Sequence, residues 1–274
     1  MQNILYCFDE NYNIQATVSM FSLLKQTNEK INFHIIHKNP KSFESLLDRI
    51  KKNQNLNDCF IHEFKNTNYN FPNIKNSHVS EATYYRMFIS DYITNDFDKV
   101  LYIDPDIVCL NPFNTTVAEI EKELINRNVL VGVKTEHVKN KQNYEIFERL
   151  SIDNKYFNAG VMSINLKMWK ELDFKTKLLE KSKIIEDNIL FWDQDVMNSE
   201  INGEYLELPP HLNQHPFEFP GSNVHFEKNT IFLHYSGKNK PWTKKGFSSP
   251  SSDFYKNIYK ELFGKNFKIS RFKK

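Results

Sequence analysis

The chain has 274 residues, of which 40% are hydrophobic, 14% aromatic and 26% charged, and its formal net charge is +2. A chain of this length can bury a large core, and its 23 Phe and 13 Tyr exclude intrinsic disorder because disordered segments are poor in aromatic residues. The sequence has no run of eighteen apolar residues and no secretory signal pattern, so it predicts neither a membrane-spanning helix nor a leader peptide.

Strands and helices are expected to alternate through the first half of the chain. Short apolar runs predict strands at 4–8, 32–38, 58–64, 99–103 and 129–133. Apolar residues at three- and four-residue spacing predict helices at 12–26, after Pro40 with Ser42 as N-cap, and at 80–93 with Ser80 as N-cap. This alternation is typical of a mainly parallel sheet with helices on both faces. Ligands bind such sheets beyond the carboxyl ends of the strands.

The three cysteines lie in or beside predicted strands, far apart in the sequence, at Cys7, Cys59 and Cys109. An odd number without paired spacing predicts reduced, buried thiols of the kind found in cytosolic proteins. The cysteines therefore predict no disulfide framework.

The predicted strand 99–103 runs directly into Asp104-Pro105-Asp106. Proline cannot continue the hydrogen-bond ladder of a strand, so both carboxylates should emerge together at the strand's carboxyl end. Two carboxylates one residue apart can share a hard divalent cation. A solvated turn also favours Asp and Pro, so the triplet alone leaves both interpretations open.

Three later segments also carry candidate site residues. Asn158-Ala159-Gly160 precedes an apolar run, where glycine allows either close approach to a ligand or a bulge before a strand. Asp193 stands at the entrance to a short predicted helix, where it could bind a ligand or cap the helix. A short strand ends at His234, and the turn after it contains Gly237 and Lys240, which suit a diphosphate, while a neutral imidazole suits Mn²⁺. A lone histidine is also often structural.

The last part of the chain is strongly basic. Residues 238–274 have eleven basic and two acidic residues, a net of +9, whereas residues 1–237 have 25 basic and 32 acidic residues, a net of −7. Aromatic and aliphatic residues recur among these lysines at helical spacing, which predicts an amphipathic helix on an anionic membrane surface. The alternative is a helix that docks its apolar side on the body of the protein. Nucleic acid is not expected as a partner, because the acidic body would repel phosphates.

In their order along the chain, these segments together resemble the retaining glycosyltransferases of family eight, above all the bacterial lipopolysaccharide galactosyl- and glucosyltransferases. The resemblance extends from residue 4 to about residue 242. The similar segments are Phe8-Asp-Glu-Asn-Tyr12, Ser80-Glu-Ala-Thr-Tyr-Tyr-Arg86, Leu101-Tyr-Ile-Asp-Pro-Asp106, Phe157-Asn-Ala-Gly160, Asp193-Gln-Asp195, Leu208-Pro-Pro-His-Leu-Asn213 and His234-Tyr-Ser-Gly-Lys-Asn-Lys-Pro-Trp242. The resemblance implies an α/β fold of the GT-A type, with a catalytic domain over 1–245 and a basic, aromatic, membrane-associating tail over 246–274.

The resemblance also implies an activity: anomer-retaining, Mn²⁺-dependent transfer of galactose or glucose from a UDP-sugar to a saccharide or glycolipid acceptor, with Mg²⁺ as the alternative ion. Asp104, Asp106 and His234 would hold the metal. The implied donor-binding residues are Asp9 and Asn11 at the uridine, Gly237 and Lys240 at the diphosphate, and Arg86, Asn158, Ala159, Asp193 and Gln194 around the hexose. Asp193 and Gln194 would stand closest to the reaction.

Retention can arise by double displacement through a protein nucleophile, or on one face of the sugar. The amide oxygen of Gln194 is a poor nucleophile, and Asp193 is better suited to bind hydroxyl groups. We therefore expect a front-face reaction in which the leaving phosphate acts as the base.

Some residues depart from the family pattern. Glu10 stands where many members have a second Asp, and residues 211–228 do not align. His211, His215 and His225 in that segment are expected to be scattered loop histidines, and acceptor choice is expected to lie partly there. Two other functions compete with the transferase: a non-catalytic UDP-sugar-binding module at the membrane, and a phosphohydrolase, which would need more carboxylates near Asp104. The expected location is cytoplasmic, peripheral on the inner face of the cell membrane.

Overall fold

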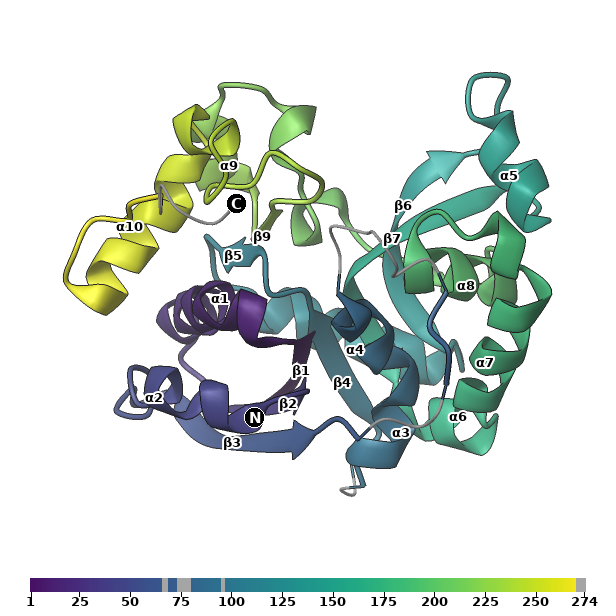
Figure 1. Ribbon diagram of the computed structural model, residues 1–274, viewed down its shortest axis with the longest axis horizontal. Coiled ribbons are helices and arrows are strands. Elements are labelled where there is room, and N and C mark those ends of the chain that lie inside the picture. Colours follow the sequence, from purple (N-terminus) through teal and green to yellow (C-terminus); the bar gives the residue numbers. More distant parts are fainter. Residues whose placement is uncertain (66–68, 73–79, 95–96, 270–274) are drawn as a thin grey trace.

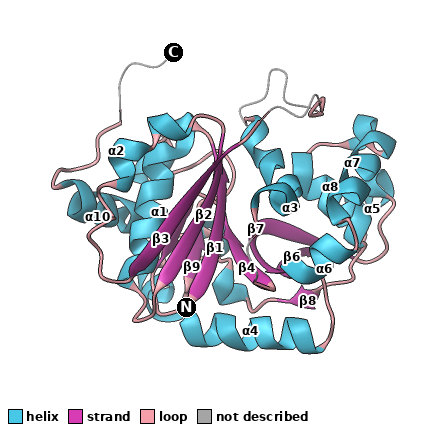
Figure 2. Cartoon of the chain, turned by 90° about the horizontal axis from the view of Figure 1, so that it is seen from below, coloured by secondary structure: helices cyan, strands magenta, loops and turns pink. Residues whose placement is uncertain are grey.

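The computed structural model describes residues 1–65, 69–72, 80–94 and 97–269. Its centre is one large sheet, with helices on both faces (Figure 2). The strands of this sheet are β1 (Gln2–Phe8), β2 (Ile31–His37), β3 (Leu56–Glu63), β4 (Lys99–Ile103), β6 (Val131–Val138), β7 (Lys155–Asn165) and β8 (Leu206–Glu207). They lie in the order β3-β2-β1-β4-β7-β6-β8.

The sheet is mainly parallel, as the alternation of elements predicts. β1 pairs in parallel with β2 and β4, β2 with β3, and β6 with β8. Only β7 runs the other way, antiparallel to both β4 and β6. The carboxyl ends of β1 and β4 therefore meet at one edge of the sheet, where ligands bind in folds of this class.

The helices connect these strands. The α-helices are α1 (Asn13–Lys25), α2 (Glu44–Leu47), α3 (Ile89–Tyr92), α4 (Asn114–Asn126), α5 (Tyr144–Leu150), α6 (Leu166–Glu171), α7 (Phe174–Ile184), α8 (Trp192–Ile201), α9 (Asn223–Asn229) and α10 (Ser252–Phe263). The 3-10 helices are η1 (Glu10–Tyr12), η2 (Pro40–Ser42), η3 (Glu81–Phe88), η4 (Glu186–Asn188), η5 (Pro210–Leu212), η6 (Pro216–Glu218) and η7 (Gly246–Ser248).

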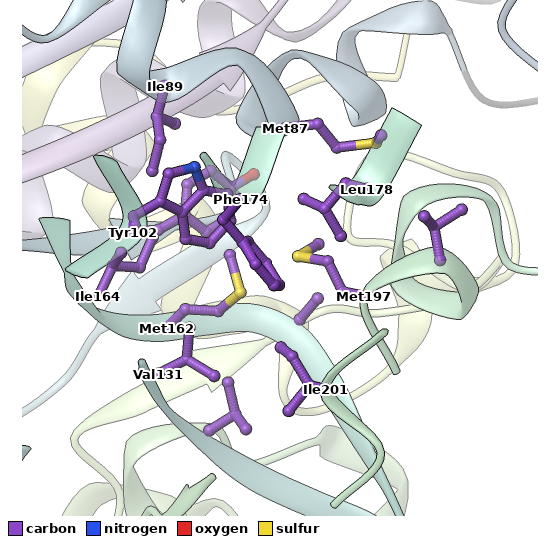
Figure 3. Close-up of a cluster of buried hydrophobic side chains, with 14 of the residues drawn as sticks. Met87, Ile89, Tyr102, Val131, Met162, Ile164, Phe174, Leu178, Met197 and Ile201 are labelled. Atoms are coloured by element: carbon purple, nitrogen blue, oxygen red, sulfur yellow. The ribbon is translucent and has the colours of Figure 1, made fainter. Parts of the chain in front are cut away.

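The core explains why the central strands are continuous apolar runs. In β1, Leu5 and Cys7 belong to the cluster covered by α5–α8, whereas Ile4, Tyr6 and Phe8 belong to the cluster covered by α1, α2 and α4. Successive side chains of a strand point to opposite faces, and here both faces are buried. Figure 3 shows part of the first cluster, where Met162 of β7 lies among side chains from α7 and α8.

A small second sheet joins the large one. β5 (Ile107–Cys109) pairs antiparallel with β9 (Phe232–His234), and Ile107 lies opposite His234. Because β5 follows β4 after only three residues, this pairing brings the end of β9 next to the turn after β4.

The C-terminal helix α10 packs on the body of the protein. Tyr255 and Tyr259 lie in a third apolar cluster with Val18 of α1 and Leu233 of β9, and Figure 1 shows α10 beside α1. The docked arrangement, stated above as the alternative for the tail, is therefore the one seen. Tail residues 270–274 lie outside the described residues. No helix in the described ranges combines the length and apolarity needed to span a membrane.

Two predicted helices differ in detail. Ser42 is not an N-cap, because it is the last residue of η2, its hydroxyl donates to the carbonyl of Asn39 and Phe43 precedes the four-residue helix α2. Ser80 does cap its helix and accepts a hydrogen bond from the backbone N–H of Ala82. That segment winds as a 3-10 helix up to Phe88, and the side chain of Arg86 donates to one of its carbonyls.

The cysteines are free, as predicted, and two of them are buried. The prediction of a buried thiol is wrong for Cys59, which is partly exposed, since β3 is an edge strand of the sheet and several of its side chains reach solvent.

Candidate functional site

A cleft of about 960 Å³ opens beyond the carboxyl ends of β1 and β4. The predicted site residues that line it come from the turn after β1, η3, the turn after β4, β7, α8, the end of β9 and the loop after β9. They are Asp9, Arg86, Asp104, Asp106, Asn158, Asp193, Gln194, His234, Gly237 and Lys240. Segments far apart in the sequence therefore converge on one cavity.

Asp104, Asp106 and His234 form a compact cluster in this cleft. One ligand atom from each lies within 4.8 Å of the others, and no other such group occurs among the residues that the structure describes. The Nε2 atom of His234 lies 3.3 Å from Asp106 and 3.8 Å from Asp104. Asp106 Oδ1 is buried and has no hydrogen-bond partner in the described chain. An unpartnered buried carboxylate oxygen beside an imidazole nitrogen fits a divalent cation.

Lys240 lies against this cluster, with its ammonium group bonded to Asp106 Oδ2 and to the carbonyl of Tyr235, the latter at 2.9 Å. Burial alone would raise the pKa of Asp106, but Lys240 and His234 outweigh that effect and lower it. Asp106 is therefore held as a carboxylate. Gly237, in the same loop, is exposed and has a left-handed φ of 76°, which suits glycine.

Arg86 connects the cluster to the opposite wall of the cleft. It is buried, with Nε at 2.6 Å from Asp193 and Nη1 at 3.3 Å from Asp104. Its guanidinium carbon lies 4.4 Å from the centre of the Tyr102 ring. Burial raises the pKa of Asp193 to about 6, although Arg86 and the Thr83 hydroxyl both act to lower it. Arg86 is thus the counter-ion of two carboxylates.

The start of α8 excludes the N-cap interpretation of Asp193. Asp193 is not the N-cap, since it is the second residue of α8 and accepts a hydrogen bond from Thr83 at 2.6 Å. Asp195 instead accepts hydrogen bonds from the backbone N–H groups of Leu190 and Phe191, both at 2.8 Å, and pairs with the partly exposed Arg149. The side chain of Asp193 therefore lines the cleft, where it is bonded to Thr83 and Arg86.

Gln194 and Ala159 are joined through the backbone. The amide oxygen of Gln194 accepts a hydrogen bond from Ala159 N–H at 3.0 Å, and its amide nitrogen donates to Tyr156 at 2.9 Å. Ala159 does not line the cleft, because it is buried and its carbonyl accepts from Arg86 at 2.6 Å. Its contribution is to hold Gln194 and Arg86 in place.

The turn after β1 differs from expectation at one residue. Asp9 accepts a hydrogen bond from the backbone N–H of Asn11 at 3.0 Å and lines the cleft. Asn11 is exposed and does not line it. Tyr12 lines it instead, with its ring 6.1 Å from that of Trp242.

Two residues behind the cluster were not predicted as site residues. Asn213 is fully buried and lies 2.9 Å from His234 Nδ1. His215, expected to be a scattered loop histidine, is buried, and its ring lies 5.0 Å from that of His234. Asn213 was within a segment that resembles the family, but nothing in the sequence indicates that it contacts His234.

The family model for glycosyl transferase family 8 matches residues 3–246. The chain belongs to this family. The lipopolysaccharide 1,2-glucosyltransferase of Escherichia coli is 28% identical over 94% of this chain and 77% of its own length. The lipopolysaccharide 1,3-galactosyltransferase of Salmonella typhimurium is 28% identical over 92% of this chain and 76% of its own length.

The fold agrees with this membership. The solved structure of the galactosyltransferase LgtC with donor and acceptor sugar analogs aligns with a TM-score of 0.77, 21% identity and 96% coverage of both chains. The chain therefore has the GT-A fold. The family 8 match includes every cleft residue from Asp9 to Lys240 and ends before α10.

Proposed function

We propose that the protein is a Mn²⁺-dependent, retaining hexosyltransferase that moves galactose or glucose from a UDP-sugar to a saccharide acceptor. The relatives named above support a lipopolysaccharide, a lipooligosaccharide or another surface glycan as the acceptor. The observation that carries the proposal is the meeting of Asp104, Asp106 and His234 with Lys240 in one cleft.

The chemistry follows from the charges around this cluster. Mn²⁺, held by the two aspartates and His234, would supply Lewis-acid stabilisation of the charge that develops on the diphosphate. Lys240 and the backbone around Gly237 would stabilise the same charge from the other side of the leaving group. Asp193 and Arg86 would form hydrogen bonds with hydroxyl groups of the donor sugar and so orient its anomeric carbon for attack by the acceptor.

Retention on one face of the sugar is supported by the surroundings of the residues nearest the hexose. The oxygen of Gln194 is already bonded to Ala159, and Asp193 is held by Arg86 and Thr83. Neither is poised as a nucleophile, so the leaving phosphate would take the proton of the acceptor hydroxyl. A glycosyl adduct on Asp193, Gln194 or Glu136, which also lines the cleft, would replace this mechanism with double displacement if mass spectrometry detected it.

The rim of the cleft suits a saccharide. Phe191 and Phe217 line the cleft and are 49% and 62% exposed. One face of the Phe217 ring stacks on His215, with the ring centres 5.0 Å apart and 5° between the planes. Flat, exposed aromatic rings at a cavity mouth can stack on the apolar face of a pyranose.

The test is turnover of a panel of nucleotide sugars without acceptor, with and without Mn²⁺. We expect slow, Mn²⁺-dependent release of UDP from UDP-galactose or UDP-glucose, because water can replace the acceptor. If no donor is consumed, UDP binding is measured by calorimetry. Binding without turnover, persisting with added glycan acceptors, would favour the non-catalytic module, and no binding would refute the assignment of the cleft.

We further propose that the protein is cytoplasmic and associates with the inner face of the cell membrane through the surface around α10. The apolar side of α10 is packed on the body, so the lysines would carry this binding. Lys260, Lys265 and Lys268 are exposed, and Lys256 is partly so. Each lysine near an anionic surface contributes roughly 1 kcal/mol.

Changing these four lysines to Gln should lower binding to vesicles rich in phosphatidylglycerol at least tenfold, as measured by sedimentation. This variant leaves the packing of α10 intact, which truncation would not. The control changes Lys41, Lys52, Lys122 and Lys177, all exposed and outside α10, to Gln and so alters the net charge equally. Equal loss in both variants, or none in the first, would show that the α10 surface is not the membrane contact.

A further inference from the structure

The backbone N–H of Gly160 fixes the orientation of a series of hydrogen-bonded side chains behind the cluster of Asp104, Asp106 and His234. The N–H of Gly160 lies 2.9 Å from the side chain of Asn158, and a backbone N–H can only donate. The atom of Asn158 in this bond must therefore be its carbonyl oxygen. Glycine is required here, since a Cβ at residue 160 would lie 2.3 Å from Cε1 and 2.6 Å from Nδ1 of the His234 ring.

The same oxygen of Asn158 determines the orientation of the next residue. Asn213 meets it at 2.9 Å and must present its amide nitrogen there, because two carbonyl oxygens cannot bond to each other. The carbonyl oxygen of Asn213 then faces His234 Nδ1 at 2.9 Å. This oxygen only accepts, so Nδ1 of His234 carries a hydrogen.

The consequence appears at the other ring nitrogen. A neutral imidazole with hydrogen on Nδ1 has its lone pair on Nε2, the atom nearest Asp104 and Asp106. The two carboxylates would by themselves favour hydrogen on Nε2, where it could be donated to them. The hydrogen bond to Asn213 instead favours the tautomer with hydrogen on Nδ1.

Asn213 is itself firmly held. Lys134 of β6 donates to its backbone carbonyl at 2.9 Å and pairs with Glu218 at 2.6 Å. Glu218 accepts from the backbone N–H of His215 at 2.9 Å, which ties down the loop just after Asn213. The segment behind His234 is thus anchored to the large sheet.

We propose that Asn213 is a positioning residue for the metal site. It holds His234 as the Nδ1–H tautomer, and Nε2 is thereby presented as a ligand for a divalent cation beside Asp104 and Asp106. The inference that Asn213 selects the tautomer stands on hydrogen bonds alone, whereas its effect on metal affinity rests on the proposed function.

Two measurements test the proposal, neither of which depends on turnover. The first is ¹⁵N NMR of the imidazole of His234 in the metal-free protein, which distinguishes hydrogen on Nδ1 from hydrogen on Nε2. We expect Nδ1–H in the wild type and a shift towards Nε2–H in Asn213→Leu, which has no acceptor for the Nδ1 hydrogen. Nε2–H in the wild type would overturn the proposal whether or not the variants fold.

The second is Mn²⁺ affinity without nucleotide, measured by electron paramagnetic resonance. We expect binding 10–100-fold weaker in Asn213→Leu, the usual effect of losing a partner that orients a metal-binding histidine. The control is Asn13→Leu, which removes a similar 2.8 Å bond to a histidine, His37, outside the cluster and should leave Mn²⁺ affinity unchanged.

The outcomes separate the two proposals. Unchanged Mn²⁺ affinity in folded Asn213→Leu, or equal losses in Asn213→Leu and Asn13→Leu, would refute the positioning role. If the wild type binds no Mn²⁺, the metal assignment fails, and the NMR result then decides the tautomer role of Asn213 by itself.

Discussion

Replacement of Asp106 by Asn should abolish detectable Mn²⁺ binding and lower UDP-sugar turnover by about a thousandfold or more. Asp106 is 8% exposed, lies 3.3 Å from His234 and has one buried oxygen without a hydrogen-bond partner in the described chain. An amide cannot neutralise a divalent cation, and loss of several kcal/mol of Lewis-acid stabilisation corresponds to three powers of ten in rate. Mn²⁺ titration and steady-state kinetics measure the two effects.

The control for this substitution is Asp195→Asn. Asp195 is also a buried, ion-paired carboxylate, but it bonds to Arg149 and to the start of α8 and does not line the cleft. Its loss should destabilise the protein while Mn²⁺ affinity is kept. Wild-type Mn²⁺ binding by folded Asp106→Asn would remove Asp106 from the metal site.

Arg86→Leu should lower the free energy of unfolding by about 3–5 kcal/mol, the usual cost of leaving a buried charge without its partner. Arg86 and Asp193 are 5% and 1% exposed and lie 2.6 Å apart. Urea unfolding of Arg86→Leu and of the double variant with Asp193→Leu measures the effect. The double variant should recover part of the loss, since it removes the abandoned carboxylate.

The loss of stability caused by Arg86→Leu should become larger as pH rises. Burial raises the pKa of folded Asp193 to about 6, above its unfolded value near 4, even with Arg86 present. The folded state therefore binds the proton more tightly, and stability falls as pH rises through this interval. Without Arg86 the pKa of Asp193 rises further. The Arg86→Leu variant should therefore lose more stability at pH 8 than at pH 5.

An exposed pair provides the comparison. Arg127 lies 2.9 Å from Glu123 on α4, and both side chains are more than half exposed. Arg127→Leu should cost less than about 1 kcal/mol, with little dependence on pH between 5 and 8. Equal, small losses in Arg86→Leu and Arg127→Leu would contradict the role of Arg86 as a buried counter-ion.

Much of the fold was predictable because the central strands are buried on both faces. Their continuous apolar runs stand out from the amphipathic helices, and Asp104 follows β4 directly in the sequence. Helix details were less predictable. The prediction of an N-cap at Ser42 is wrong because the chain there forms a short 3-10 helix, in which the Ser42 hydroxyl bonds to the carbonyl of Asn39.

The rest of the site depends on contacts between distant residues. The partnership of His234 with Asp106 came from family resemblance, since nothing local relates residues so far apart. The position of Asn213 depends on the isolated β-bridge between Gln214 and Leu233. The sequence pattern does not predict that these two residues pair. The exposure of Asn11 follows from the tight turn that Asp9 closes by accepting from its backbone N–H.

The pairing of β5 with β9 has a consequence for how the protein is made. Asp104 and Asp106 are synthesised in the first half of the chain, whereas His234 arrives 128 residues after Asp106 (234 minus 106). The cluster of Asp104, Asp106 and His234 therefore cannot assemble on the ribosome until the chain as far as β9 has emerged and β9 has reached β5. Once formed, a cation shared by these three residues would act as a cross-link that closes a very long loop, and it would favour the folded chain over the unfolded one.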